Sequence, residues 1–217
     1  MSSRDAVLGR IRAALTDVPP DETPDDVPVP RAYRRSHTAP GEDLVALFAE
    51  RVTDYRATVH HTDEAGLPAA ISAALTSRGV QNLALPSGFP VELLLPDPWT
   101  WHREPLGVSD LDALDGTLTL AAAGIAVTGT IVLDTGPGQG RRALTLVPDH
   151  HLCVVYAEQI AADVPDALAR LDPTRPLTFV SGPSATSDIE LDRVEGVHGP
   201  RTLDVIVVAP THPEKNS

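Results

Sequence analysis

Residues 152–180 of the chain, L-C-V-V-Y-A-E-Q-I-A-A-D-V-P-D-A-L-A-R-L-D-P-T-R-P-L-T-F-V, decide its class of fold. An apolar run at 152–156 predicts a strand, the pattern at 160–171 predicts a helix, and 177–180 predicts a second strand. Strands that alternate with helices are typical of an α/β fold with a sheet that is at least partly parallel.

The same alternation continues on both sides of this stretch. Gly79 is placed to end a helix, because glycine readily adopts the left-handed conformation found after a last helical turn. A β-rich run at 123–134 is interrupted by Thr128-Gly129-Thr130, and a glycine inside a strand pattern indicates a bulge or a close backbone approach. The further expected elements are helices at 42–55, 69–77 and 111–114 and strands at 57–60, 80–85, 118–122 and 205–208.

The N-terminal residues form a separate region. Residues 3–15 predict a short helix with Val7, Leu8, Ile11 and Leu15 on one face and Ser2 or Ser3 as its N-cap. The segment that follows, up to Pro40, is rich in proline and aspartate and predicts an extended tether. We therefore expect two parts: a helix and tether at 1–40, and an α/β domain at 41–217.

Composition and charge exclude several classes of protein. The 217 residues carry a net charge of −13, whereas proteins that bind nucleic acid cluster Lys and Arg, so no nucleic-acid partner is expected. The longest mostly apolar stretch, 118–127, is shorter than the ~20 residues of a membrane helix, and the N-terminus does not resemble a secretory signal. We expect a soluble cytoplasmic protein without membrane insertion.

Cysteine content limits redox and metal chemistry. The single Cys153 excludes an internal disulfide and any multi-cysteine metal or iron–sulfur site within this chain. It lies in the apolar run 152–156, which favours a buried small hydrophobic residue over a reactive thiol. The histidines show no metal-ligand spacing, so neither a metal site nor a cofactor is expected.

The polar stretch 180–200, V-S-G-P-S-A-T-S-D-I-E-L-D-R-V-E-G-V-H-G-P, is the strongest candidate for function. If a helical turn begins here, its free N–H groups and hydroxyls form a cradle for an anion. If the chain is extended, Asp188 and Glu190 share one face, where a carboxylate buried beside another suits acid–base or nucleophilic chemistry. A solvated acidic face, or a plain connection between strands, is the alternative.

Two other features could contact a ligand. The glycine-rich loop 136–142 lacks the G-x-x-x-x-G-K-[ST] pattern of a nucleotide-binding loop, but Arg141 and Arg142 are plausible contacts for an anion. His150, His151 and His198 could act as acid, base or ligand, or could be structural. His198 differs from the others because glycines flank it.

The stretches S-G-P-S-A-T-S-D-I-E (181–190) and G-V-H-G-P (196–200) resemble the signature of the lactate utilisation protein C family (LutC/YkgG, LUD domain). Residues 128–130, Arg142, Pro148 and His151 fit two further elements of the pattern, and the resemblance covers about 42–210. Ser187 replaces the usual alanine. Val127 stands where the family often carries an acidic residue, which leaves any role of that carboxylate open for this chain.

The resemblance implies a NagB/RpiA/CoA-transferase-like fold, a mostly parallel sheet flanked by helices. It also implies a role in oxidising L-lactate to pyruvate beside iron–sulfur subunits. We expect an accessory, non-redox component that binds a small anionic ligand or partner segment at 181–200, and homo-oligomers are possible. A stand-alone enzyme acting on a sugar phosphate or acyl-CoA is the alternative, and the resemblance does not decide whether the chain is catalytic. The candidate catalytic residues are Glu190, Asp188 and His198, and the candidate ligand-binding residues are Ser181, Gly182, Ser184, Thr186, Thr128, Gly129, Thr130, Arg142, His151 and Gly199.

Overall fold

The computed structural model describes residues 2–19, 21–23, 26, 29–30, 37–96, 98–186, 194–195 and 199–209. The chain divides into two units, Met1–Arg34 and Arg35–Ser217. The first contains helix α1 (Ser3–Ala14), which begins with a capping box between Ser2 and Asp5, so the expected N-cap is confirmed. No residue of α1 is buried. The expected division at residue 40 stays a prediction.

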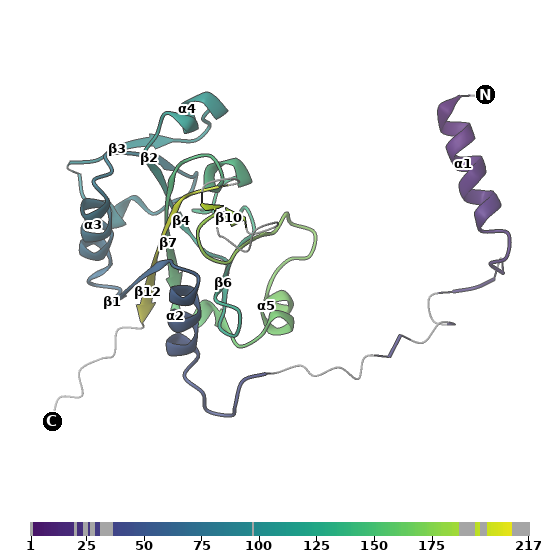
Figure 1. Cartoon of the computed structure of the whole chain (residues 1–217), viewed down its shortest axis with the longest axis horizontal. Coiled ribbons are helices and arrows are strands. Elements are labelled where there is room, and N and C mark those ends of the chain that lie inside the picture. Colours follow the sequence, from purple (N-terminus) through teal and green to yellow (C-terminus); the bar gives the residue numbers. More distant parts are fainter. Residues whose placement is uncertain are drawn as a thin grey trace. The chain divides into compact units, whose positions relative to one another are not determined.

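A six-stranded sheet in which every neighbouring pair runs parallel forms the centre of the second unit (Figure 1). The expected α/β class with a mostly parallel sheet is therefore confirmed. The strand order is β1-β12-β7-β4-β2-β3. The strands are β1 (Thr58–Asp63), β2 (Asn82–Leu85), β3 (Thr100–Arg103), β4 (Gly116–Leu120), β7 (His150–Tyr156) and β12 (Thr202–Ala209).

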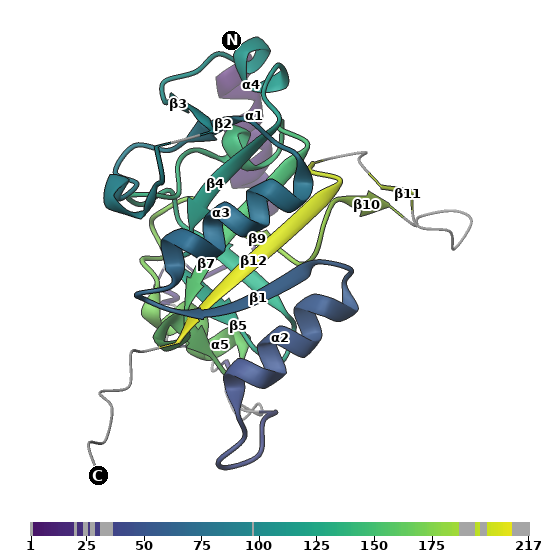
Figure 2. The same ribbon diagram turned by 90° about the vertical axis from the view of Figure 1, so that its left-hand side faces the viewer.

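Helix α3 (Leu67–Arg78) covers one face of this sheet, and Figure 2 looks onto that face. Because side chains alternate along a strand, the even-numbered residues of β7 and β12, such as Val154 and Ile206, pack beneath α3. Odd-numbered residues such as Cys153 and Val205 pack on the opposite face. Gly79 ends α3 with φ 67°, the left-handed C-cap expected from the sequence.

The opposite face is covered by helix α2 (Leu44–Asp54) and by a second sheet, with helix α5 (Val164–Arg170) packed on the far side of that sheet. The second sheet has four strands in the order β8-β5-β6-β9 and mixed directions. Its strands are β5 (Ala123–Ile125), β6 (Thr130–Leu133), β8 (Ile160–Ala161) and β9 (Thr178–Val180). The second unit thus consists of layers: α3, the parallel sheet, the small mixed sheet together with α2, and α5.

The β-rich run at 123–134 is a hairpin of β5 and β6. Gly129 turns the chain with φ 57°, and a Cβ there would lie 2.6 Å from the carbonyl carbon of Arg51. The close backbone approach expected at this glycine is confirmed.

One expectation for 152–180 needs correction. Residues 160 and 161 form β8, and the helix expected from residue 160 begins only at Val164, with Pro165 in its first turn, where proline is well tolerated. The final strand, β9, leaves the parallel sheet and pairs antiparallel with β6. The remaining elements are α4 (Val108–Asp112), η2 (Val91–Leu93), η3 (Arg142–Thr145), η4 (Ala157–Gln159), β10 (Ala185–Thr186) and β11 (Val194–Glu195).

Cys153 is fully buried in β7, and burial raises the pKa of its thiol to about 12. The expected inert, buried cysteine is confirmed. Among the helices that the structure describes, none is both long and apolar enough to cross a membrane.

Candidate functional site

A pocket of about 310 Å³ lies beside the amino ends of β7 and β12. Four segments form it: η3, the beginning of β7, the stretch from β9 to Ser184, and the residues that lead into and begin β12. Its lining residues are Arg142, Thr145, Leu146, His151, Thr178, Phe179, Val180, Ser181, Gly182, Pro183, Ser184, Gly199, Pro200 and Leu203.

Several of the candidate ligand-binding residues meet in this pocket. The list of shared residues is Arg142, His151, Ser181, Gly182, Ser184 and Gly199. They were selected from sequence positions up to about sixty residues apart, and the fold places them around one cavity. That they bind a ligand stays a prediction, but their convergence is an observation.

The wall formed by 181–184 is held in place by close backbone contacts. The backbone N–H of Ser184 donates to the carbonyl of Pro200 at 2.8 Å, which joins the two ends of the motif region. Gly182 has φ 80°, and a Cβ there would lie 2.6 Å from the Cβ of Tyr55. Only glycine combines this backbone conformation with so close an approach, so Gly182 fixes the wall against the end of α2.

The Thr128–Thr130 element supports this wall without lining the pocket. The hydroxyl of Thr130 lies 2.8 Å from that of Ser181 and 2.7 Å from that of Thr128. Thr128 and the neighbouring Val127 line a different pocket, of about 470 Å³. An acidic residue at position 127 would therefore face that second pocket.

His151 forms part of the pocket floor. Its side chain is buried, and its Nε2 lies 2.8 Å from the hydroxyl of Thr119. Burial, with a smaller contribution from the charge of His150, lowers the pKa of His151 to about 3. The ring is therefore neutral at physiological pH, and its Nδ1 makes no hydrogen bond with a described residue. A neutral imidazole of this kind can position a ligand by hydrogen bonding.

Arg142 and Arg141 have different environments. Arg141 donates from Nε to Glu104 Oε1 at 2.9 Å and also contacts the carbonyl of Leu106. The side chain of Arg142 is exposed at the pocket and makes no hydrogen bond or ion pair within the part of the chain that the structure describes. Arg142 is thus the arginine available to an anionic ligand.

The candidate catalytic residues Asp188, Glu190 and His198 lie outside the described residues. Thr186 belongs to β10, which pairs antiparallel with β11. No group of three or more His, Cys, Asp and Glu side chains suited to a metal ion occurs among the described residues.

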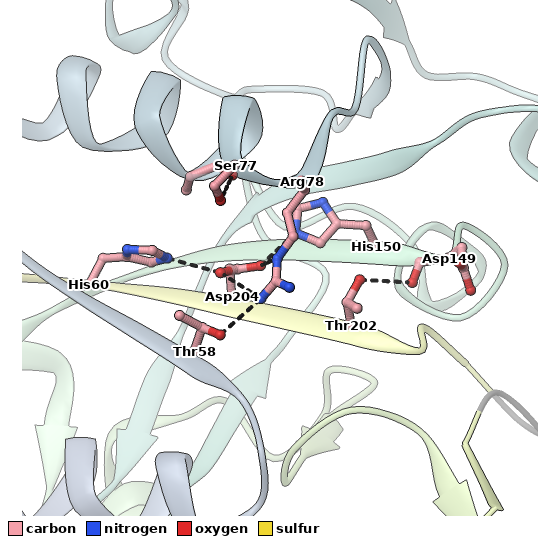
Figure 3. A network of polar contacts seen from close by, with 9 residues as sticks. Thr58, His60, Ser77, Arg78, Asp149, His150, Thr202 and Asp204 are labelled. Carbon is pink, nitrogen blue, oxygen red and sulfur yellow. Dashed lines mark hydrogen bonds and ion pairs between the residues drawn. The ribbon is translucent and has the colours of Figure 1, made fainter.

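Near the same amino ends of β7 and β12, but on the opposite face of the parallel sheet, Asp204 is the centre of a polar network that was not predicted from the sequence (Figure 3). Its fully buried carboxylate accepts hydrogen bonds from His60 Nε2 at 2.9 Å and from His150 Nε2 at 2.9 Å. Arg78 donates to it from Nε at 2.7 Å and also reaches the hydroxyl of Thr58. The network joins β1, β7, β12 and α3.

Burial by itself raises the pKa of Asp204, but hydrogen bonds from His150, Arg78 and His60 outweigh it and hold the pKa well below its usual range. The carboxylate is therefore ionised and acts only as an acceptor. The Nδ1 of His150 is buried without a hydrogen-bond partner among the described residues, and it lies 3.1 Å from where a Cβ on Gly116 would be. One signal in the sequence pointed to this network: Asp204 is the only charged residue in the apolar run 203–208, and a buried carboxylate needs partners.

The comparisons with known proteins agree with this fold. The family model described as "LUD domain" matches residues 109–208. A protein of Deinococcus radiodurans named "Lactate utilization protein C" is 42% identical over 207 residues, covering 93% of both chains. A protein of the same name from Halalkalibacterium halodurans is 26% identical, covering 77% of this chain and 80% of its own length.

A solved structure is also similar. The crystal structure of a DUF162 family protein from Deinococcus radiodurans has 40% sequence identity and a TM-score of 0.65, and the match covers 76% of this chain and 96% of that chain. The extent of the similarity to the Deinococcus radiodurans relative settles the classification. The chain belongs to the lactate utilisation protein C family.

Proposed function

We propose that this chain is an accessory, non-redox component of an L-lactate oxidation system and that it binds a carboxylate-bearing ligand in the pocket at Arg142 and His151. The ligand is a small anion or an acidic segment of a partner. The names of the relatives support the role in lactate utilisation. The single cysteine supports the non-redox role, because this chain cannot supply the thiolates of an iron–sulfur cluster. Iron–sulfur subunits that carry the electrons are the proposed partners.

The observation that carries the binding role is the convergence of the motif residues on one pocket with a guanidinium that has no partner among the described residues. Arg142 offers a planar donor that matches a carboxylate, and His151 is a neutral ring beside it. The pocket volume of about 310 Å³ lies at the lower end of the range of roughly 300–1,000 Å³ for small-molecule sites. The pocket thus suits a small, singly charged acid.

A binding measurement tests the pocket. Isothermal titration with L-lactate and with pyruvate is expected to show binding to the unaltered chain and a loss of about 10- to 100-fold in Arg142→Ala, since a hydrogen bond to a charged group contributes roughly 1.5–3 kcal/mol. Arg103→Ala is the matched control, because Arg103 is an exposed arginine that does not line the pocket. Equal effects of the two substitutions would argue against the pocket.

A growth experiment tests the role in the cell. Deletion of the gene is expected to impair growth on L-lactate, and the unaltered gene is expected to restore it. The Arg142→Ala gene is expected to restore it less well than the Arg103→Ala gene at equal protein levels. Unimpaired growth of the deletion strain on L-lactate would refute the proposed role.

A further inference from the structure

One wall of the pocket is the edge of a sheet. Strand β9 is the last strand of the small sheet and pairs with β6 through Thr178, Phe179 and Val180. No strand among the described residues pairs with its other side. The same residues line the pocket, so the backbone of an edge strand borders the cavity. Unpaired N–H and C=O groups at a sheet edge are a template for a further strand.

This edge is short, with three residues in β9, but unlike the two edges of the parallel sheet it carries no charged side chain. The two edges of the parallel sheet carry ionisable side chains: His60, His61 and Asp63 on β1, and His102 and Arg103 on β3. Charged residues on an edge discourage pairing with another chain. The sequence of β9, Thr-Phe-Val, has no charge and no proline.

Phe179 provides an anchor beside this edge. Its side chain is 49% exposed, whereas the neighbouring Val180 packs against the core on the other face of the small sheet. Aromatic residues, phenylalanine among them, are enriched at protein–protein interfaces. A strand added to β9 would place every second of its side chains on the face of the sheet that carries Phe179, and one of them would lie opposite this residue.

Arg142 determines the charge of the occupant. It lines the same pocket and makes no ion pair within the described part of the chain, so an acidic group on the occupant would complement it. The chain as a whole has a net charge of −13, which disfavours a strongly acidic peptide. An apolar segment with one carboxylate therefore fits better than an acidic run.

We propose that β9 receives an extended segment of a partner protein as an added strand, with an apolar side chain on Phe179 and a single carboxylate on Arg142. This inference rests on the proposed function and names the occupant of the same pocket. Main-chain hydrogen bonds to β9 supply affinity in this mode of recognition, and the alternating side chains supply specificity.

Selection from a random heptapeptide library displayed on phage, with the full-length chain as target, tests the occupant. The expected result is enrichment of peptides in which apolar residues alternate and one Asp, Glu or terminal carboxylate is present. The synthetic form of an enriched peptide is expected to bind at least 10-fold more weakly to Arg142→Ala and to Phe179→Ser. Arg103→Ala and Val108→Ser are matched controls, because Val108 is an apolar residue of 61% exposure outside the pocket. Failure to enrich, or equal losses in the controls, overturns the inference.

Backbone methylation of the enriched peptide tests the added strand itself. In a strand, the N–H groups of alternate residues point toward the same neighbour. N-methylation of one alternate set is expected to weaken binding at least 10-fold, and methylation of the other set is expected to have little effect. Equal tolerance at all positions overturns strand addition.

The two proposals fail separately. If L-lactate binds and growth depends on the gene, but no peptide is selected, the added strand is refuted and the proposed function stands. If peptides bind with the expected pattern but deletion leaves growth on L-lactate intact, the lactate role is refuted and the docking surface stands.

Discussion

His150 and His151 are neighbours in β7, but their side chains lie on opposite faces of the sheet and in opposite chemical settings. His150 joins the buried network of Asp204, in which Arg78 and His60 also donate to the carboxylate. His151 joins the pocket, where the guanidinium of Arg142 has no partner among the described residues. The comparison shows that the two faces of the sheet use their polar groups differently: one face pairs them and the other leaves them facing a pocket.

The difference lies in whether the charges are paired. A buried carboxylate is tolerated only when donors surround it, and the donors of Asp204 come from three other elements of the fold. Such a network holds strands and a helix together. An exposed, unpaired guanidinium contributes little to folding and can be used for binding instead. We therefore expect substitutions on the two faces to affect different measurements.

The largest effect on stability is expected from Asp204→Asn. This change removes the charge that Arg78 and the two histidines surround, and breaking a buried ion pair typically costs about 3–5 kcal/mol of unfolding free energy. Urea denaturation of the full chain measures the loss. Asp149→Asn is the control, because its pair with Arg201 is exposed at the surface, and its loss should be far smaller. Similar losses of unfolding free energy in both variants would mean that the buried network stabilises the fold no more than an exposed ion pair does.

The same carboxylate predicts a pH dependence. The pKa of the Asp204 carboxyl is lower in the folded state than in the unfolded chain, where it is ~4. Its contribution to stability is therefore fully present above the unfolded-state pKa and is lost as the pH falls through the folded-state pKa. The difference in unfolding free energy between the unaltered chain and Asp204→Asn should shrink as the pH falls below ~4. A difference that stays constant below pH ~4 would contradict this assignment.

Gly182→Ala is expected to have an intermediate effect. A Cβ at this position would meet Tyr55 at 2.6 Å, and φ 80° is strained for alanine, so a loss of roughly 1–3 kcal/mol is expected. Because the wall of the pocket must move, binding of L-lactate should weaken too. Gly41→Ala is the control, with a similar φ of 81° but open space around it. If both variants lose the same stability, the contact with Tyr55 is unimportant.

The smallest effect on stability is expected from Arg142→Ala. Because the side chain is exposed and unpaired among the described residues, the change in unfolding free energy should stay within about 0.5 kcal/mol. Ligand binding should nevertheless fall, as stated above. A large loss of unfolding free energy would mean that Arg142 stabilises the fold as the Asp204 network does, and it would contradict the expected difference between the two faces of the sheet.

Much of the fold follows from the sequence because local patterns report local conformation. The alternation of strands and helices predicted the α/β class, Gly79 predicted the end of α3, and Ser2 predicted a helix cap. These features depend on residues within one or two turns of each other. The placement of β9 was missed, because its partner β6 lies far away in the chain. The β5–β6 hairpin was missed although its strands are close in sequence, because the glycine between them indicated a bulge or a close backbone approach rather than a turn.

The candidate site shows the same division. The motif residues Ser181, Ser184 and Gly199 could be selected from the sequence, but their meeting with Arg142 and His151 could not. The sequence by itself determined the class of fold, the polar motif and the single cysteine, which rules out a multi-cysteine cluster within this chain. Only the tertiary structure decided which pocket arginine has no partner in the described part of the chain, which histidine is neutral and which carboxylate is surrounded by donors. Burial and pairing depend on every element that packs around a group, and these elements are brought together only by folding.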